Sequence, residues 1–225
     1  MTNFSVFDEP NEPGLPPPKA QRMGYVVHVT LDRVKPPIWR RLLVASDLNL
    51  SQLHMVLQTA MGWTLSHLHG FEVWSVQQHR FVDSGLLSWH DVEQDGRSGP
   101  CEADVQLSQV LTKAGEKMLY LYDFGNNWAH RVRLEKTVNW VNGAPLARCL
   151  AGKRACPPED CGGPSGFALF LRQAAQNHKG GTDAPEDSEW GWEFDQFDPE
   201  EFDMAQVNQN LAAEEQDGFE EGMAW

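Results

Sequence analysis

One hairpin signal constrains the fold of this chain more than any other feature. Residues 118–124 and 130–138 are rich in β-forming side chains, and apolar residues recur at every second position, as in Leu119 and Leu121. This period is typical of a strand with one buried face. Residues 125–127, Gly-Asn-Asn, supply turn chemistry between the two runs. The runs are therefore predicted to be adjacent antiparallel strands.

The N-terminal part predicts two further strands and then a helix. Residues 25–31 alternate apolar and polar side chains, and residues 38–44 form a second apolar run. From residue 50 the apolar period changes from two to that of a helix, which is expected to cover residues 50–61. Its candidate boundary residues are Asn49 or Ser51 at the start and Gly62 at the end.

The remaining segments predict shorter elements. We expect a hairpin from residues 71–76 and 79–82, a helical turn at 107–111, a helix over 167–175 that starts near Pro164, and loops over 83–104 and 143–166.

Together these patterns predict an α+β fold, in which a mostly antiparallel sheet has helices packed on it within a single domain. We expect a flexible proline-rich leader over residues 1–22, an α+β core over 23–180 and an acidic C-terminal segment over 181–225. Aromatic residues lie among the carboxylates of that last segment. It is therefore expected to pack partly on the core, because a fully solvated acidic tail would have few aromatics.

The net charge of −14 is spread unevenly. Residues 183–225 hold 15 Asp and Glu and no Lys or Arg, whereas residues 19–182 hold 18 basic against 14 acidic side chains. The chain is thus a slightly basic body with acidic ends. This charge does not favour nucleic acid as a partner, although it leaves a local contact open. The sequence does not indicate an oligomeric state.

Two absences bear on location. No stretch approaches the roughly 18 to 20 apolar residues of a membrane helix, and four cysteines are too few for the disulfide framework of a small secreted domain. We therefore expect no membrane partner and a reducing, cytoplasmic location.

Several strings recur in the order of a known family. They are Pro37-Ile38-Trp39-Arg40-Arg41, Leu53-His54, Met61-Gly62-Trp63, His67-Leu68-His69, Tyr122-Asp123-Phe124-Gly125, Trp128, His130-Arg131, the run Gly152 to Gly163, and Phe197-Asp198-Pro199 with Phe202. Over residues 25–211 the chain resembles the plasmid pRiA4b ORF-3-like family, also labelled the insertion-element passenger TnpR type. The resemblance implies an α+β fold, residence on plasmids and insertion elements, and no agreed activity. This chain has Asn126 where the family usually has Asp, and Ala129 where Glu is common.

Four residues form a candidate metal site: His67, His69, Asp123 and His130. If the run after His67 is a strand, the two histidines share a face, and the hairpin carries Asp123 and His130 beside its turn. Imidazole and carboxylate together suit a divalent metal such as zinc or manganese, and His54 is an alternative member. In the other interpretation the histidines cap turns and Asp123 closes the hairpin with its own side chain.

Cys149, Cys156 and Cys161 form a second cluster, with six and four residues between them. One interpretation is a zinc site of three cysteines and a histidine. The other is a structural group of buried thiols in a loop held by prolines and glycines.

A third group consists of Trp39, Arg40 and Arg41. Adjacent arginines on a strand point to opposite faces, so one could form an internal ion pair, with Asp123 or Glu159, while the other meets solvent or nucleic acid.

Two functional hypotheses follow. The first is a non-enzymatic binding or accessory module of plasmids and mobile elements, with a groove lined by Trp63, His67, His69, Trp128 and His130. The second is a metal-dependent hydrolase, directed at nucleic acid or phosphoesters, with the four candidate metal ligands.

Overall fold

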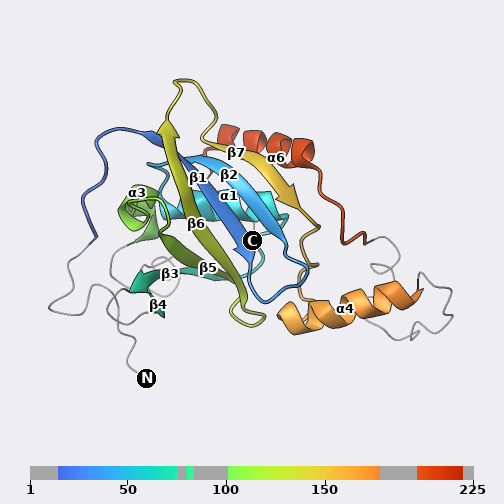
Figure 1. The fold of residues 1–225 in the computed structure, drawn as a ribbon. Coiled ribbons are helices and arrows are strands. Elements are labelled where there is room, and N and C mark those ends of the chain that lie inside the picture. The colour runs from blue at the N-terminus through green and yellow to red at the C-terminus, as the bar shows by residue number, and fades with distance from the viewer. Residues whose placement is uncertain (1–14, 76–79, 84–100, 178–196, 220–225) are drawn as a thin grey trace.

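Seven strands form one antiparallel sheet in the order β4-β3-β5-β6-β1-β2-β7 (Figure 1). The structure is a computed structural model and describes residues 15–75, 80–83, 101–177 and 197–219. The α+β fold predicted from the sequence is confirmed.

The elements have the following bounds. The strands are β1 (Met23–Leu31), β2 (Trp39–Ala45), β3 (His69–Ser75), β4 (Arg80–Asp83), β5 (Lys117–Tyr122), β6 (Trp128–Asn139) and β7 (Ala147–Lys153). The helices are α1 (Leu50–Met61), the 3-10 helix η1 (Glu102–Asp104), α3 (Leu107–Val110), α4 (Gly163–Asn177) and α6 (Met204–Gln216).

The predicted hairpin is present, but the sequence misled on which face of β5 is buried. β5 and β6 pair antiparallel, from Lys117 opposite Arg133 to Tyr122 opposite Trp128. Met118, Tyr120 and Tyr122 are buried, whereas Leu119 and Leu121 are half-buried on the other face. The tyrosines point inward because their hydroxyls find polar partners there, as described below.

Helix α1 agrees with its prediction at both ends. Asn49 and Gln52 form a reciprocal capping box, in which the Gln52 N–H donates to Asn49 Oδ1 at 2.8 Å and the Asn49 N–H donates to Gln52 Oε1 at 3.1 Å. Gly62 ends the helix in the left-handed conformation, with φ of 95°.

Two elements near the C-terminus were not predicted. Residues 143–166 were expected to be a loop, but β7 lies within them and pairs with β2 at the edge of the sheet, and α4 already begins at Gly163. Helix α6 follows the N-cap Asp203 and packs against α1 and β7. Helix α6 is mostly exposed and β7 is an edge strand with two buried residues, so the apolar periodicity of each is weak.

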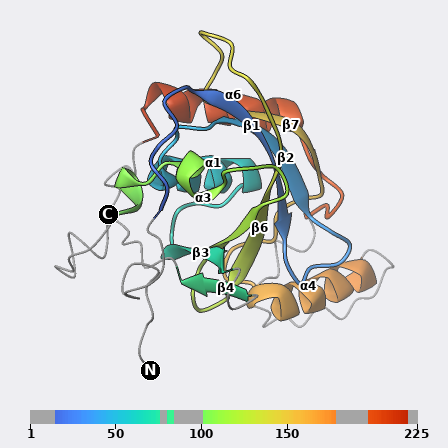
Figure 2. The ribbon, with the colours of Figure 1, turned by 60° about the vertical axis from the view of Figure 1, so that its left-hand side comes forward.

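The sheet has an inner and an outer face. Tyr25, Leu42 and Val132 are fully buried on the inner face, where α1 lies. In Figure 2 α1 is seen within the curve of the sheet, with α6 above it. Among the described elements no helix covers the outer face, which points toward the viewer in Figure 1.

The described parts of the two ends contact the body. Lys19 Nζ donates to the Tyr25 hydroxyl at 2.6 Å, and Phe197 makes ring contacts with Phe167 and Phe170. Residues 1–14 of the predicted leader, residues 76–79, residues 84–100 of the predicted loop, and Trp190, Trp192 and Phe194 lie outside the described residues. Of the helices that the structure describes, none combines the length and the apolarity needed to cross a bilayer.

Candidate functional site

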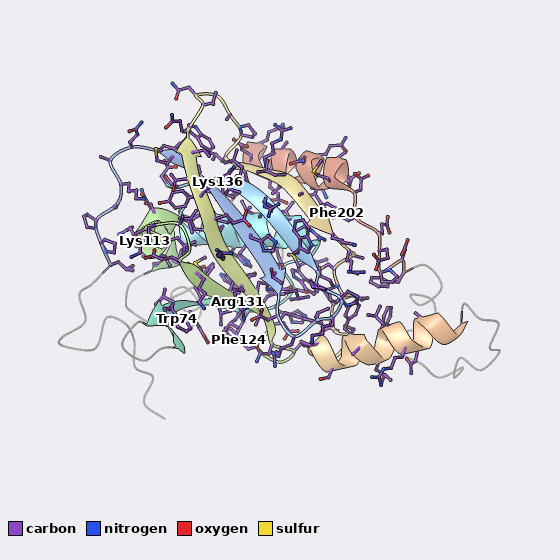
Figure 3. The ribbon with its side chains drawn as sticks, in the orientation of Figure 1. Trp74, Lys113, Phe124, Arg131, Lys136 and Phe202 are labelled. Carbon is purple, nitrogen blue, oxygen red and sulfur yellow. The ribbon has the colours of Figure 1, made fainter. Side chains whose placement is uncertain are left out.

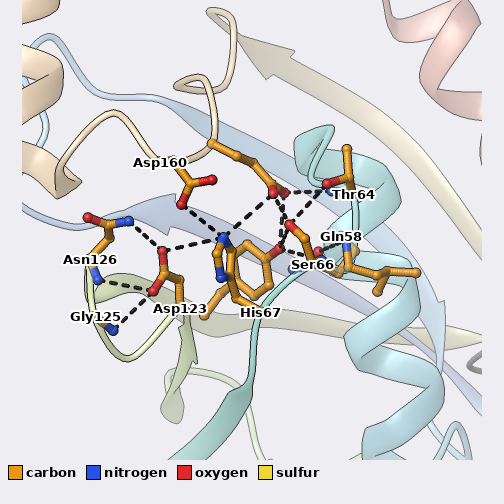
Figure 4. Close-up of polar contacts among 11 residues, drawn as sticks. Gln58, Thr64, Ser66, His67, Asp123, Gly125, Asn126 and Asp160 are labelled. Carbon is orange, nitrogen blue, oxygen red and sulfur yellow. Dashed lines mark hydrogen bonds and ion pairs between the residues drawn. The ribbon is translucent and has the colours of Figure 1, made fainter. Parts of the chain in front are cut away.

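Three loops meet at one end of the sheet. They are the α1–β3 connection (residues 62–68), the β5–β6 turn (residues 123–127) and the segment between β7 and α4 (residues 154–162), and Figure 4 shows their side chains facing one another. The chain therefore brings together segments that are more than 90 residues apart in sequence.

Asp123 shapes the β5–β6 turn. Its backbone is left-handed, with φ of 56°, and its Oδ1 accepts hydrogen bonds from the N–H groups of Gly125 (3.0 Å) and Asn126 (3.1 Å). The Asn126 amide donates to Asp123 Oδ2 at 2.5 Å. The expected closure of the hairpin by its own carboxylate is thus present, and Oδ2 is left facing the other two loops (Figure 4).

Glu159 holds the α1–β3 connection in place. It accepts hydrogen bonds from the Thr64 N–H (2.7 Å), the Ser66 hydroxyl and the Tyr122 hydroxyl (3.0 Å). Burial opposes ionisation of Glu159, but these donors outweigh it and lower the pKa of its carboxyl group. Burial raises the pKa of Tyr122 well above its usual value, so the phenol stays protonated as a donor.

His67 stands among three carboxylates. Its Nε2 lies 3.2 Å from Asp160 Oδ1, 3.8 Å from Asp123 Oδ2 and 3.9 Å from Glu159 Oε2. This nitrogen is buried and has no hydrogen-bond partner among the described residues, so it does not align with any one of the carboxylates. Ligand atoms of His67, Asp123 and Asp160 all lie within 4.8 Å of one another.

Gly163 allows the segment after β7 to reach the turn. Its φ is 69°, and a Cβ atom at this position would collide with the carbonyl oxygen of Asn126. Only glycine combines this backbone conformation with so close an approach. The position of Asp160 and Glu159 relative to Asp123 therefore depends on Gly163.

The structure separates His69 from His67. β3 begins at His69, so His67 lies in the loop before it and the two imidazoles do not share a strand face. His69 Nε2 is 3.0 Å from Oε1 of the buried Glu102, and its ring stacks on His54 at 3.5 Å between centroids. His54 Nδ1 in turn is 2.7 Å from the Tyr120 hydroxyl. His69 and His54 thus belong to a separate buried polar group.

His130, Trp63 and Trp128 belong to the core. His130 is fully buried, and its Nε2 accepts a hydrogen bond of 3.3 Å from Trp63 Nε1. Trp63 packs against Trp128, which is also fully buried. These three residues line no open groove, and His130 makes no ion pair with a carboxylate of the described residues.

The four cysteines are free thiols, and two of them, Cys149 and Cys156, lie near the Arg40 charge. Burial raises the pKa of both Cys149 and Cys156, although the Arg40 charge opposes this in each case. Cys161 is buried and lies near Cys156. Within the described residues no cysteine belongs to a group of potential ligand atoms close enough to share a metal ion.

The two arginines point to opposite faces, but their partners differ from those expected. Arg40 is buried and donates to the carbonyl groups of Ala60, Trp39 and Lys153 at 2.8 to 3.1 Å. Arg41 forms a two-pronged ion pair with Glu135 on the outer face, at 2.7 and 3.0 Å. Asp123 and Glu159 belong instead to the loop cluster.

Sequence analysis identified His67 and Asp123 and missed Asp160 and Glu159 as their companions. Glu159 had been considered as an ion-pair partner of an arginine, and neither carboxylate had been connected with His67. A signal was present, because most strings that carry the resemblance are loop segments, and loops positioned by a scaffold are where binding groups concentrate.

The fold and site define an α+β protein in which a histidine and three carboxylates from three loops gather at one end of an antiparallel sheet. Residues 23–206 match the family described as plasmid pRiA4b ORF-3-like protein, and the chain belongs to that family.

Two relatives extend this result. The chain is 40% identical over 149 residues to the uncharacterized protein y4hQ of Sinorhizobium fredii, which covers 65% of this chain and 71% of that protein. The crystal structure of MM3350, a protein of unknown function from Methanosarcina mazei, is similar with a TM-score of 0.63 and 31% identity, over 84% of this chain and 99% of the other.

Proposed function

We propose that the protein is a non-enzymatic accessory module that binds a divalent cation through His67, Asp123 and Asp160. The observation that supports this most strongly is the buried His67 Nε2, which has no hydrogen-bond partner among the described residues and stands 3.2 to 3.9 Å from three carboxylate oxygens. Two ligand atoms on one tetrahedral zinc ion are roughly 3.4 Å apart, given metal–ligand distances near 2.1 Å. Small side-chain movements would therefore complete the site.

The donor set favours zinc or manganese. One imidazole with two or three carboxylates suits borderline divalent ions, whereas calcium prefers oxygen ligands alone. Asp160 is 67% exposed, so the site opens to solvent on that side. Glu159 would act as a further ligand or orient the others from the surrounding shell.

The geometry favours binding over hydrolysis by the same centre. A metal-dependent hydrolase needs a group that takes a proton from the attacking water. Glu159 is the neighbouring carboxylate, but it already accepts three hydrogen bonds and its pKa is lowered, which makes it a weak base. The family's plasmid description likewise suits an accessory role in the cytoplasm of a host that carries mobile elements.

The test is metal analysis of protein purified without a histidine tag. We expect about one zinc or manganese ion per chain, and affinity at least about tenfold lower in His67→Ala and in Asp160→Asn, as for lost metal ligands or their supports. Asp104→Asn is the matched control, because Asp104 is an exposed aspartate outside the three loops. A metal content far below one per chain that reconstitution does not raise would refute the proposal. So would equal losses in the control.

A further inference from the structure

Strand β7 forms one edge of the sheet, and among the described strands it pairs only with β2. An edge strand carries backbone N–H and C=O groups that no strand of its own sheet engages, and another chain can pair with them. β7 has seven residues, whereas the described strand at the opposite edge, β4, has four. The β7 edge is therefore the longer described template for pairing with a second molecule.

The C-terminal segment runs along this edge in the direction opposite to β7. The Pro199 carbonyl group accepts a hydrogen bond of 3.2 Å from the Ala155 N–H, just after β7. A Cβ atom at Gly152 would collide with the ring of Phe202, so this ring lies directly on the β7 backbone (Figure 3). Helix α6 then continues along the strand, and Figure 1 shows it beside β7.

Two side chains of α6 bind the β7 edge as a neighbouring strand would. Asn208 Oδ1 accepts a hydrogen bond of 2.8 Å from the Cys149 N–H, and Asn208 Nδ2 donates to the Cys149 carbonyl group at 3.0 Å. A residue of an adjacent antiparallel strand would form the same pair of hydrogen bonds with Cys149. Glu215 Oε2 accepts from the Leu146 N–H at 3.0 Å, immediately before β7. Residues 199–215 therefore engage the edge from one end to the other.

The packing of α6 does not by itself require these polar contacts. Leu211 is the only residue of α6 that is buried, and asparagine is a weak helix former in a helix interior. An apolar side chain at position 208 would suit both the helix and the strand surface. Asn208 instead matches the backbone groups of the edge. The register between β2 and β7 also shifts beside Leu42, and such irregularities are a further feature of edges that are protected from strand addition.

We infer that helix α6 shields the β7 edge and thereby prevents β7 of a second copy of this chain from pairing with it. Without Asn208, the N–H and C=O groups of Cys149 can bond to the same groups of a second Cys149 across a twofold axis. In that register Arg148 lies opposite Leu150 of the other copy, so no like charges face each other. Leu150 is 40% exposed and Arg148 is exposed, so both side chains are available at this edge.

The test is the molar mass of the full chain, measured by light scattering over a wide range of protein concentrations. In Asn208→Ala combined with Glu215→Ala, the mass should rise with concentration toward about twice that of the wild type, as for a twofold dimer. Asn210→Ala combined with Glu214→Ala is the matched control. It changes the same residue types on the same helix, and Asn210 is exposed and bonded to Gln206 instead of β7. The control should keep the wild-type mass.

Two substitutions at Leu150 test the pairing register. In the background of the Asn208 and Glu215 substitutions, Leu150→Lys places a like charge opposite Arg148 of the other copy, so the mass should return to that of the wild type. Leu150→Glu places the opposite charge there and should preserve the association. A purely structural role of Asn208 and Glu215 would not distinguish these two variants.

Hydrogen exchange of the Cys149 amide measures whether the cover has been loosened. We expect exchange at least about threefold faster in the double variant, as for the loss of one hydrogen bond. The inference is overturned by a wild-type mass at every concentration, by unchanged exchange, by equal association of the control, or by equal effects of lysine and glutamate at position 150. Asn208→Ala alone provides a second reading if the double variant does not fold. No cation takes part in these measurements, so their outcome is independent of the proposed cation site.

Discussion

Acidification should destabilise this protein through the buried imidazole of His130. Burial lowers the pKa of His130 to about 4, with backbone acceptors opposing the effect only in part. In the unfolded chain the same group has a pKa near 6.5. The unfolded state therefore binds the proton first as the pH falls, and the contribution of neutral His130 to stability is lost progressively from pH 6.5 toward pH 4.

The magnitude follows from the two pKa values. The full difference corresponds to about 3 kcal/mol, and between pH 7 and pH 5 the free energy of unfolding should fall by about 2 kcal/mol from this residue alone. The pKa of His54 is also lowered, by burial and by the neighbouring His69, so it acts in the same direction.

The assay is urea unfolding followed by tryptophan fluorescence at pH 7 and pH 5. His130→Gln keeps an acceptor for Trp63 Nε1 but cannot be protonated. We expect it to be less stable than the wild type at pH 7 and to lose about 2 kcal/mol less on acidification. His28→Gln is the control. The pKa of His28 is also lowered, but this residue is only half-buried, so replacing it should change the pH dependence of stability less than His130→Gln does. If His130→Gln retained the wild-type pH dependence, the reasoning would be wrong.

Three further predictions concern the loops and the core. Gly163→Ala should lower the free energy of unfolding in urea by about 1 to 3 kcal/mol and weaken cation binding in calorimetry. A side chain at this left-handed residue strains the backbone and pushes the loop away from Asn126. Unchanged cation affinity would contradict this prediction. Arg40→Ala should lower the free energy of unfolding by about 3 kcal/mol or more in the same assay. The substitution leaves three carbonyl groups without their donor and removes the contact with Phe202. A decrease below about 1 kcal/mol would contradict this prediction. Asn126→Asp replaces an amide donor by a carboxylate beside Asp123, so it should lower the urea midpoint of the metal-free protein. The added negative charge should also raise the affinity for zinc or manganese at least about tenfold. A weaker affinity would count against the proposed cation site.

The fold could be predicted wherever local signals were strong. Asn49, the apolar spacing of residues 50–61 and Gly62 defined α1 at both ends. The turn residues 125–127 defined the β5–β6 hairpin. β7 could not be recognised in the same way, because an edge strand that is half-exposed lacks a clear apolar alternation among its glycine, cysteine and arginine residues.

The face of β5 shows where apolarity alone is a poor guide. Leu119 and Leu121 are more hydrophobic than tyrosine, yet the structure buries Tyr120 and Tyr122 in their place. The Tyr120 hydroxyl accepts a hydrogen bond from Gln58 at 2.7 Å, and that of Tyr122 donates to Glu159. Burial of a tyrosine is favourable when its hydroxyl has such partners, and those partners come from distant segments that no sequence window contains.

The site was only partly predictable for the same reason. His67 and Asp123 could be chosen by residue type, but His67 and Asp160 are 93 residues apart and meet only because Gly163 lets the loop before α4 approach the β5–β6 turn. His69 and His130 have side-chain chemistry that suits a metal site. They are nevertheless committed to other partners, Glu102 and Trp63.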